Sequence, residues 1–217
     1  MSLGAGGGNQ FAAAVVVAAS LGGPDALGAV LGALPPDFPA PILVAQHTGP
    51  TSPRYLPQLL RRQTTLLVRY AAVGDLPRSG TVYIAPPGQH LLVGPDARCA
   101  ISDGPRVNFA RPAADLLFTS AAEVFGARAI GVVLTGRLFD GAAGAEAIRR
   151  TGGVVLAQDP ATCRAPDMPR AAIERGAAHL ALPPAALAEA LVSLVAAPAG
   201  AARLGLDPFL PGQTAAS

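Results

Sequence analysis

The sequence contains neither tryptophan nor lysine, and only two of its 217 residues are cysteines. All sixteen basic residues are therefore arginine, so the chain offers no amine for Schiff-base catalysis and no lysine for a phosphate-binding Walker motif. Cys99 and Cys163 stand far apart in the sequence, which indicates neither a zinc cage nor a disulfide framework. We expect a protein of the reducing cytoplasm.

Charge is also sparse, because only 14% of the residues are charged and the formal net charge is +2. Without a run of basic residues, the sequence predicts no binding to nucleic acid or to an anionic membrane. The apolar run at residues 11–19 is shorter than the roughly 20 residues that cross a bilayer, so we expect no membrane insertion. The three histidines are scattered, and neither a metal nor an organic cofactor is implied.

What the chain has in abundance is apolar residues, which make up 51% of it and suffice for the core of one domain. Short apolar runs alternate with stretches of helical period, the pattern of an α/β fold. We predict a doubly wound, mostly parallel sheet flanked by helices (Rossmann-like) over residues 11–197. Residues 1–10 are interpreted as a disordered segment or cloning remnant, and residues 198–217 as a loose tail.

Buried strands of the parallel sheet are expected at residues 13–19, 41–46, 129–135, 154–158 and 179–182. Between them, the short runs at 81–85, 90–93 and 98–102 are separated by turn residues at hairpin spacing. We predict an antiparallel hairpin insert there.

Three polar residues lie just beyond the ends of predicted strands: Ser20, His47 and Asp140. Ligands bind at the carboxyl ends of the strands in an open parallel sheet. A serine becomes a nucleophile when a histidine takes its proton and a carboxylate orients that histidine. The order serine, histidine, aspartate differs from the orders of the common serine hydrolases, and no Gly-x-Ser-x-Gly elbow is present, so a lipase-type fold is not expected.

Each of these residues also has a structural explanation. Ser20 precedes a predicted helix and fits an N-cap, Asp140 fits the cap of the next helix, and His47 fits a hydrogen-bonded histidine at a strand end. The glycine-rich turn after Ser20 resembles an anion site at a helix start, although the full dinucleotide-binding spacing is missing.

Six segments together resemble one known family: AASLGG around Ser20, VAQHTGP around His47, YIAPPGQH, DGPRVNFARPAADLLFTS, LTGRLFDGAAG around Asp140, and APDMPRAAIERGA. In this order and spacing they resemble the catalytic domain of CheB, the chemotaxis protein-glutamate methylesterase, over roughly residues 12–196. The combination is far more specific than any single motif.

The resemblance implies a serine hydrolase that removes methyl esters from glutamates on the cytoplasmic helices of methyl-accepting chemoreceptors. Many members of the family also deamidate receptor glutamines, so the resemblance implies this second activity as well. By the same resemblance the nucleophile falls on Ser20, the base on His47 and the carboxylate on Asp140, with the backbone N–H of Arg137 as oxyanion donor. The amides around Leu21 and Gly22, at a helix start, are a second candidate for that role.

The family pattern Thr-Gly-Met-Gly-x-Asp-Gly is altered here, because Arg137 replaces the methionine and Leu138 a glycine. A left-handed glycine cannot become leucine without strain or a different turn. Arg137 is expected either to project over the cleft toward an acidic substrate or to be solvated. Arg170 either lines the cleft edge or lies on a helix surface, and Leu21 makes the rim more apolar than the threonine common in the family.

Other matched residues fit structural roles. Arg111 and Asp115 are expected to form an ion pair or a helix-start contact, and His90 to hydrogen-bond a nearby loop.

Chemotaxis members of the family usually carry an N-terminal receiver domain, and none fits before Phe11. The chain is therefore interpreted as an excised fragment or a stand-alone esterase, whose regulatory partner would be a separate receiver protein. The altered loop keeps a second function open: a catalytically weak or inactive relative that acts as a binding or regulatory module.

Overall fold

The computed structural model describes residues 11–49 and 51–196. The two predicted terminal segments, 1–10 and 198–217, lie outside the described residues, as does the predicted domain boundary at residue 197.

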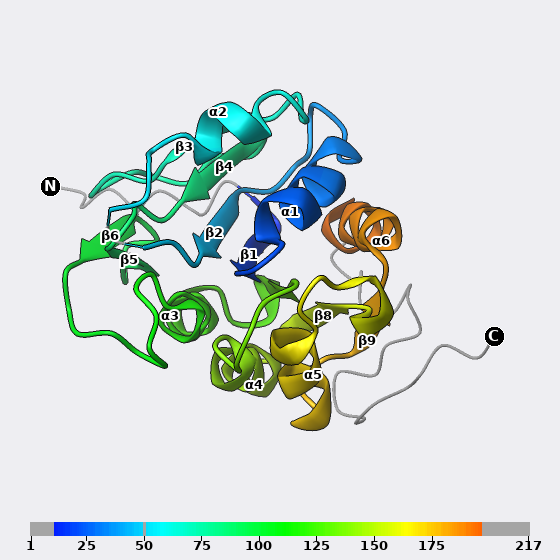
Figure 1. The fold of residues 1–217 in the computed structure, drawn as a ribbon. Coiled ribbons are helices and arrows are strands. Elements are labelled where there is room, and N and C mark those ends of the chain that lie inside the picture. The colour runs from blue at the N-terminus through cyan, green and yellow to red at the C-terminus, as the bar shows by residue number, and fades with distance from the viewer. Residues whose placement is uncertain (1–10, 50, 197–217) are drawn as a thin grey trace, which may run out of the picture.

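A seven-stranded parallel sheet forms the centre of the fold (Figure 1). Its strands are, in spatial order, β3 (Leu67–Tyr70), β4 (Thr81–Ile84), β2 (Ile42–Gln46), β1 (Ala14–Ala19), β7 (Ala129–Val133), β8 (Val154–Gln158) and β9 (Leu180–Leu182). Every neighbouring pair runs parallel. The predicted doubly wound α/β architecture is confirmed.

Helices cover both faces of this sheet (Figure 1). One face carries α1 (Gly23–Gly32), α2 (Leu56–Leu60) and α6 (Pro184–Ala196), and the other carries α3 (Ala114–Phe125), α4 (Ala142–Arg150) and α5 (Asp167–Glu174). None of the helices in the described part of the chain is long and apolar enough to span a bilayer.

The position of β1 in the middle of the sheet explains why its sequence is an uninterrupted apolar run. All six of its residues are buried. Val15 and Val17 pack in the core under α1 and α6, whereas Val16 and Ala18 pack in the core under α3 and α4. Because successive side chains of a strand point to opposite faces, only a run without polar positions satisfies both cores.

The middle of the chain departs from the prediction in two ways. The expected hairpin insert is present as an antiparallel pair, β5 (His90–Val93) and β6 (Cys99–Ser102), but β4 belongs to the large sheet between β2 and β3. Strand β3 was not predicted, because at the sheet edge only Val68 is fully buried and the apolar signal is weak.

The strand order reverses beside β1, and this reversal creates the site. The connection that leaves β1 passes through α1 on one face, whereas the connection that leaves β7 passes through α4 on the other. The loops after β1 and β7 therefore diverge and leave a crevice at the carboxyl ends of the strands.

Candidate active site

Backbone hydrogen bonds tie together the loops that carry the three candidate residues. The amide of Ser20 donates to the carbonyl of Thr135 at 3.0 Å, and the amide of His47 donates to the carbonyl of Ala19 at 2.8 Å. The strand ladder thus continues one residue beyond β1 and β2. Ser20 and His47 are held at the sheet edge by main-chain contacts that do not depend on their side chains.

Gln46, which the sequence reasoning missed, reinforces this placement. Its Nε2 donates to the carbonyls of Ser20 and His47, each at 2.9 Å. The residue is only 4% exposed, and a buried amide is retained where it has hydrogen-bond partners. The available signal was a glutamine ending a strand whose other four residues are apolar.

His47 and Asp140 are in direct contact, since Nε2 of His47 lies 2.6 Å from Oδ2 of Asp140. Asp140 is completely buried and also accepts hydrogen bonds from the amides of Ala114 at 2.6 Å and Asp115 at 3.2 Å. The side chain of Asn108 donates to its other oxygen at 3.2 Å. The carboxylate is therefore held by the N-terminus of α3, where free amides favour a negative charge.

The helix caps rule out the structural explanations given above for Ser20 and Asp140. The N-cap position of α1 is occupied by Gly22, and that of α4 by Gly141, in both cases without a side-chain hydrogen bond. Ser20 and Asp140 therefore do not cap the helices that follow them.

The surroundings keep Asp140 ionised. Burial acts to raise the pKa of its carboxyl, but the hydrogen bonds from His47 and Ala114 outweigh burial and hold this pKa below its usual value. Burial raises the pKa of the neighbouring Asp115, which accepts a hydrogen bond from the amide of Gly144 and lies next to the charge of Asp140. The two carboxyls, 25 residues apart, thus respond oppositely to similar burial.

The contact with Asp140 defines the state of the His47 ring. An ionised carboxylate can only accept, so Nε2 of His47 carries the proton and Nδ1 has a free lone pair. Within residues 11–49 and 51–196, Nδ1 makes no hydrogen bond and the Ser20 hydroxyl donates none to it. Nucleophile and base are often further apart in ligand-free sites than in the complex with substrate.

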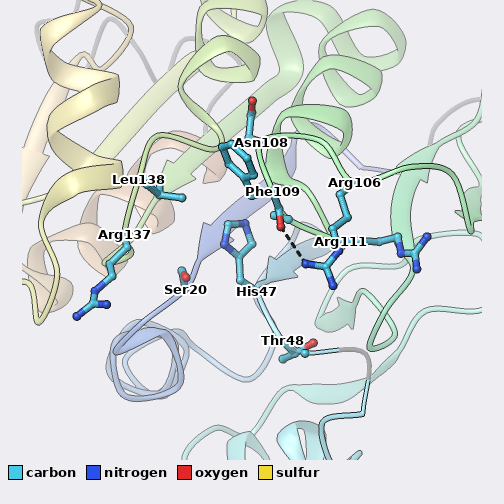
Figure 2. Close-up of a pocket in the computed structure, with 11 residues that line it drawn as sticks. Ser20, His47, Thr48, Arg106, Asn108, Phe109, Arg111, Arg137 and Leu138 are labelled. Carbon is cyan, nitrogen blue, oxygen red and sulfur yellow. Dashed lines mark hydrogen bonds between the residues drawn. The ribbon is translucent and has the colours of Figure 1, made fainter.

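Ser20 and His47 lie together where two cavities meet. One cavity, of about 330 Å³, is lined by Arg106, Asn108, Phe109, Arg111, Arg137 and Leu138 in addition to these two residues (Figure 2). The other, of about 600 Å³, extends toward α1 and α2 and contains Leu21, Gly22, Tyr55 and Arg164. Serine and histidine thus line both cavities, which together form one groove around them.

The predicted oxyanion donors border the same groove. In the described part of the chain, the backbone N–H groups of Leu21 and Arg137 donate no hydrogen bond. Thr135 connects their two loops, because its buried hydroxyl contacts the carbonyls of Leu21 at 2.9 Å and Ala165 at 3.1 Å. Gly22 has a φ of 82° and takes the N-cap position, a conformation that disfavours side chains.

The altered loop keeps the glycine conformation despite the substitution. Leu138 has a φ of 66°, so it adopts the left-handed backbone at a cost of about 1–2 kcal/mol. Across the cavity, Asn108 and Phe109 have φ values of 50° and 64°. Leu138 is 51% exposed and Phe109 is 77% exposed. Strained backbone and solvated apolar side chains line this cavity together, a combination typical of ligand-contacting segments.

The remaining predicted residues have simple placements. Arg170 is exposed on α5 and lines neither of the two cavities around Ser20, whereas Arg164, which was not singled out, does. The predicted ion pair between Arg111 and Asp115 is wrong, because Arg111 donates to the carbonyls of Asp103 and Gly104.

His90 is buried and has the predicted scaffold role. Its Nε2 lies 2.9 Å from the carbonyl of Pro105, and its Nδ1 accepts from the amide of Ala113. It thereby fixes the loop that leads to the N-terminus of α3. Among the described residues, no three His, Cys, Asp or Glu side chains are grouped to hold a metal ion.

A serine, a histidine and a buried carboxylate at the switch point of a doubly wound sheet define the class of protein, an α/β domain with the side-chain set of a serine hydrolase. The family description "CheB methylesterase" matches residues 15–191. The chain belongs to the CheB methylesterase family.

A solved structure and curated relatives agree with this family assignment. The fold superimposes with a TM-score of 0.81 on the CheB methylesterase catalytic domain of Thermotoga maritima, at 37% identity, covering 84% of this chain and 98% of that one. The chain is 46% identical to protein-glutamate methylesterase FrzG of Myxococcus xanthus, covering 83% of this chain and 54% of the relative. It is 42% identical to a protein-glutamate methylesterase/protein-glutamine glutaminase of Symbiobacterium thermophilum, covering 83% and 50%. The chain thus spans about half the length of these curated relatives.

Proposed function

We propose that this domain hydrolyses the γ-methyl esters of glutamate side chains in proteins, with Ser20 as nucleophile, His47 as base and Asp140 as the orienting carboxylate. The observation that carries the proposal is the 2.6 Å contact between Nε2 of His47 and the buried Asp140, which leaves Nδ1 of His47 free beside Ser20. The proposed carrier of the ester is a methyl-accepting chemoreceptor helix, in keeping with the chemotaxis family of the matched relatives.

In the proposed acylation step, Oγ of Ser20 attacks the ester carbonyl carbon while Nδ1 of His47 takes the hydroxyl proton. The carbonyl electron pair moves onto oxygen, and the free amides of Leu21 and Arg137 donate to this oxyanion. The carbon–methoxy bond then breaks, and His47 protonates the leaving oxygen to give methanol. Asp140 stabilises the positive charge that His47 carries between these events.

Deacylation repeats the sequence with water in place of serine. His47 takes a proton from the water, the resulting hydroxide attacks the acyl carbon, and the second intermediate expels Oγ of Ser20, which regains its proton from His47. The products are the free enzyme and a glutamate carboxyl group, which releases its proton to water and becomes a carboxylate. A glutamine side chain would follow the same route with ammonia as the leaving group, which makes deamidation part of the proposal.

The direct test is methanol release from membranes that carry methylated chemoreceptors. We expect release by the wild type, and a loss of at least about 10³-fold in Ser20→Ala and His47→Ala. Ser79→Ala is the matched control, because Ser79 is exposed and lines neither cavity around Ser20. Release by Ser20→Ala at the wild-type rate would contradict the proposed nucleophile.

The left-handed Leu138 favours the second candidate, a binding module without turnover, because a strained loop can misplace the Arg137 amide. A fluorophosphonate probe distinguishes the two candidates. Labelling that disappears in Ser20→Ala supports an activated serine. Absence of both labelling and methanol release, together with saturable binding of an ester-bearing peptide, supports the binding module.

A further inference from the structure

Four arginines line the groove, and in the described part of the chain none of them forms an ion pair with a carboxylate. Arg137 and Arg164 are exposed and, within residues 11–49 and 51–196, form no ion pair. Arg106 donates only to the carbonyl of Phe109 at 3.4 Å, as the dashed line in Figure 2 marks. Arg111 likewise contacts carbonyls only.

Three arginines elsewhere in the described part of the chain do pair with carboxylates. Arg69 pairs with Asp75, Arg98 with Asp96 and Arg175 with Glu146. The 330 Å³ cavity has three arginines and no acidic residue in its lining, and Asp25 is the acidic side chain that lines the 600 Å³ cavity. Positively charged side chains therefore outnumber acidic ones in the lining of the groove.

Arg137 and Arg164 reach the groove from different loops beside Ser20. Arg137 follows β7 and forms part of the wall of the smaller cavity, and its side chain extends outward from Ser20, away from His47 (Figure 2). Arg164 lines the larger cavity and lies against the turn after Ser20, because a Cβ placed on Gly22 would be 2.7 Å from the Cβ of Arg164. Their positions flank the place where the ester would react.

The reacting group itself has no need of these charges. A methyl ester and an amide are neutral, so a guanidinium gains little from either one, whereas it binds a carboxylate strongly. The partners that suit Arg137 and Arg164 are therefore acidic side chains next to the reacting residue.

We propose that Arg137 and Arg164 are specificity residues that bind carboxylates flanking the scissile ester. The domain then prefers a neutral ester or amide set in an acidic segment. Since each hydrolysis creates a new carboxylate, hydrolysis at one position promotes hydrolysis at its neighbour. This inference rests on the proposed function of the same site.

Two peptides that differ only in flanking charge test the inference. Both contain one glutamate γ-methyl ester, flanked on each side by glutamates in one peptide and by glutamines in the other. We expect kcat/KM to be about tenfold higher for the acidic peptide at low ionic strength, and this preference to shrink as salt screens the charges. Arg137→Gln and Arg164→Gln should each reduce the preference about threefold, the scale of an exposed ion pair.

Two further variants complete the design: one reverses the charge at Arg137, and the other changes an arginine far from the site. Arg137→Glu should shift the preference toward the neutral peptide, a change that a merely structural role would not produce. Arg150→Gln is the matched control, since Arg150 is exposed at the C-terminal end of α4, the end opposite the site. Equal kcat/KM for both peptides in the wild type, or an unchanged preference in the Arg137/Arg164 double variant, would overturn the inference.

The same assay separates this inference from the proposed function. If the wild type hydrolyses both peptides equally and Ser20→Ala hydrolyses neither, the esterase assignment stands and the charge preference is wrong. If the wild type hydrolyses neither peptide and releases no methanol from methylated receptors, both are wrong.

Discussion

Nε2 of His47 lies 2.6 Å from Oδ2 of Asp140, and Asp140 has no access to solvent. A buried carboxylate is stable only when hydrogen bonds and opposite charge replace the lost water. Here the fold supplies these partners itself, from the amides of Ala114 and Asp115 and the side chain of Asn108. The orientation of His47 is thus built into the domain before any substrate arrives.

Asp140→Asn should lower kcat for ester hydrolysis by about 10⁴-fold, as loss of the orienting carboxylate removes the correct histidine tautomer. The asparagine NH2 would face either His47 and the amide of Ala114, the partners of Oδ2, or the amide of Asp115 and the side chain of Asn108, the partners of Oδ1. Donors would meet in both orientations, so we also expect a stability loss of about 1–3 kcal/mol. Activity is measured well below the unfolding temperature of the variant to separate the two effects. A loss of kcat below tenfold would contradict the proposed role.

Acid unfolding provides a second test of Asp140. Because its pKa is lower in the folded state than in the unfolded chain, its carboxylate stabilises the fold above about pH 4, and this contribution is lost as the pH falls through the lowered pKa. Urea unfolding at a series of pH values should therefore show a smaller decline in acid for Asp140→Asn than for the wild type.

Asp115 is the matched control for that experiment. Its pKa is raised, so its contribution to stability is present at low pH and is lost as the pH rises through the raised value. Asp115→Asn should change the pH dependence in the opposite direction. If stability depended on pH in the same way in both variants, burial and hydrogen bonding would not shift the pKa values of the two carboxyls in opposite directions.

Leu138→Gly separates folding from function in the altered loop. Glycine relieves the left-handed strain of about 1–2 kcal/mol but adds about 0.5–1 kcal/mol of unfolded-state freedom, so stability should rise by no more than about 1.5 kcal/mol. If the exposed leucine contacts substrate, KM for a protein substrate should rise while KM for a small ester stays constant. A pronounced fall in unfolding temperature would instead assign Leu138 a packing role.

The sequence predicted the edge on which Ser20, His47 and Asp140 gather, because each follows an uninterrupted apolar run and such runs form parallel strands buried on both faces. It did not predict that β4 joins the large sheet, since the residues of a short strand do not specify which distant strand they pair with. The backbone hydrogen bonds to Asp140 were equally hidden. They come from the start of α3, which lies 25 residues earlier in the chain, and not from the adjacent α4.

Gly136 sets how closely the loop after β7 approaches the proposed nucleophile. A Cβ on Gly136 would lie 2.7 Å from the Cβ of Ser20 and would overlap with Sδ of Met168. Met168 is fully buried, and Ser20 is fixed by the hydrogen bond of its amide to Thr135. Neither neighbour can move away freely, so Gly136→Ala must displace Ser20 or the loop that carries Arg137.

We expect Gly136→Ala to reduce kcat by about 10²-fold, since small displacements of a reacting group have effects of this size. Gly94→Ala is the control, because there the added Cβ meets the side chain of Asp96, which is 64% exposed and lines neither cavity around Ser20. Kinetics with one small ester, at a temperature where both variants are folded, provide the comparison. A kcat for Gly136→Ala within twofold of the wild type would mean that this loop yields without moving Ser20, and the close packing between them would then have no part in catalysis.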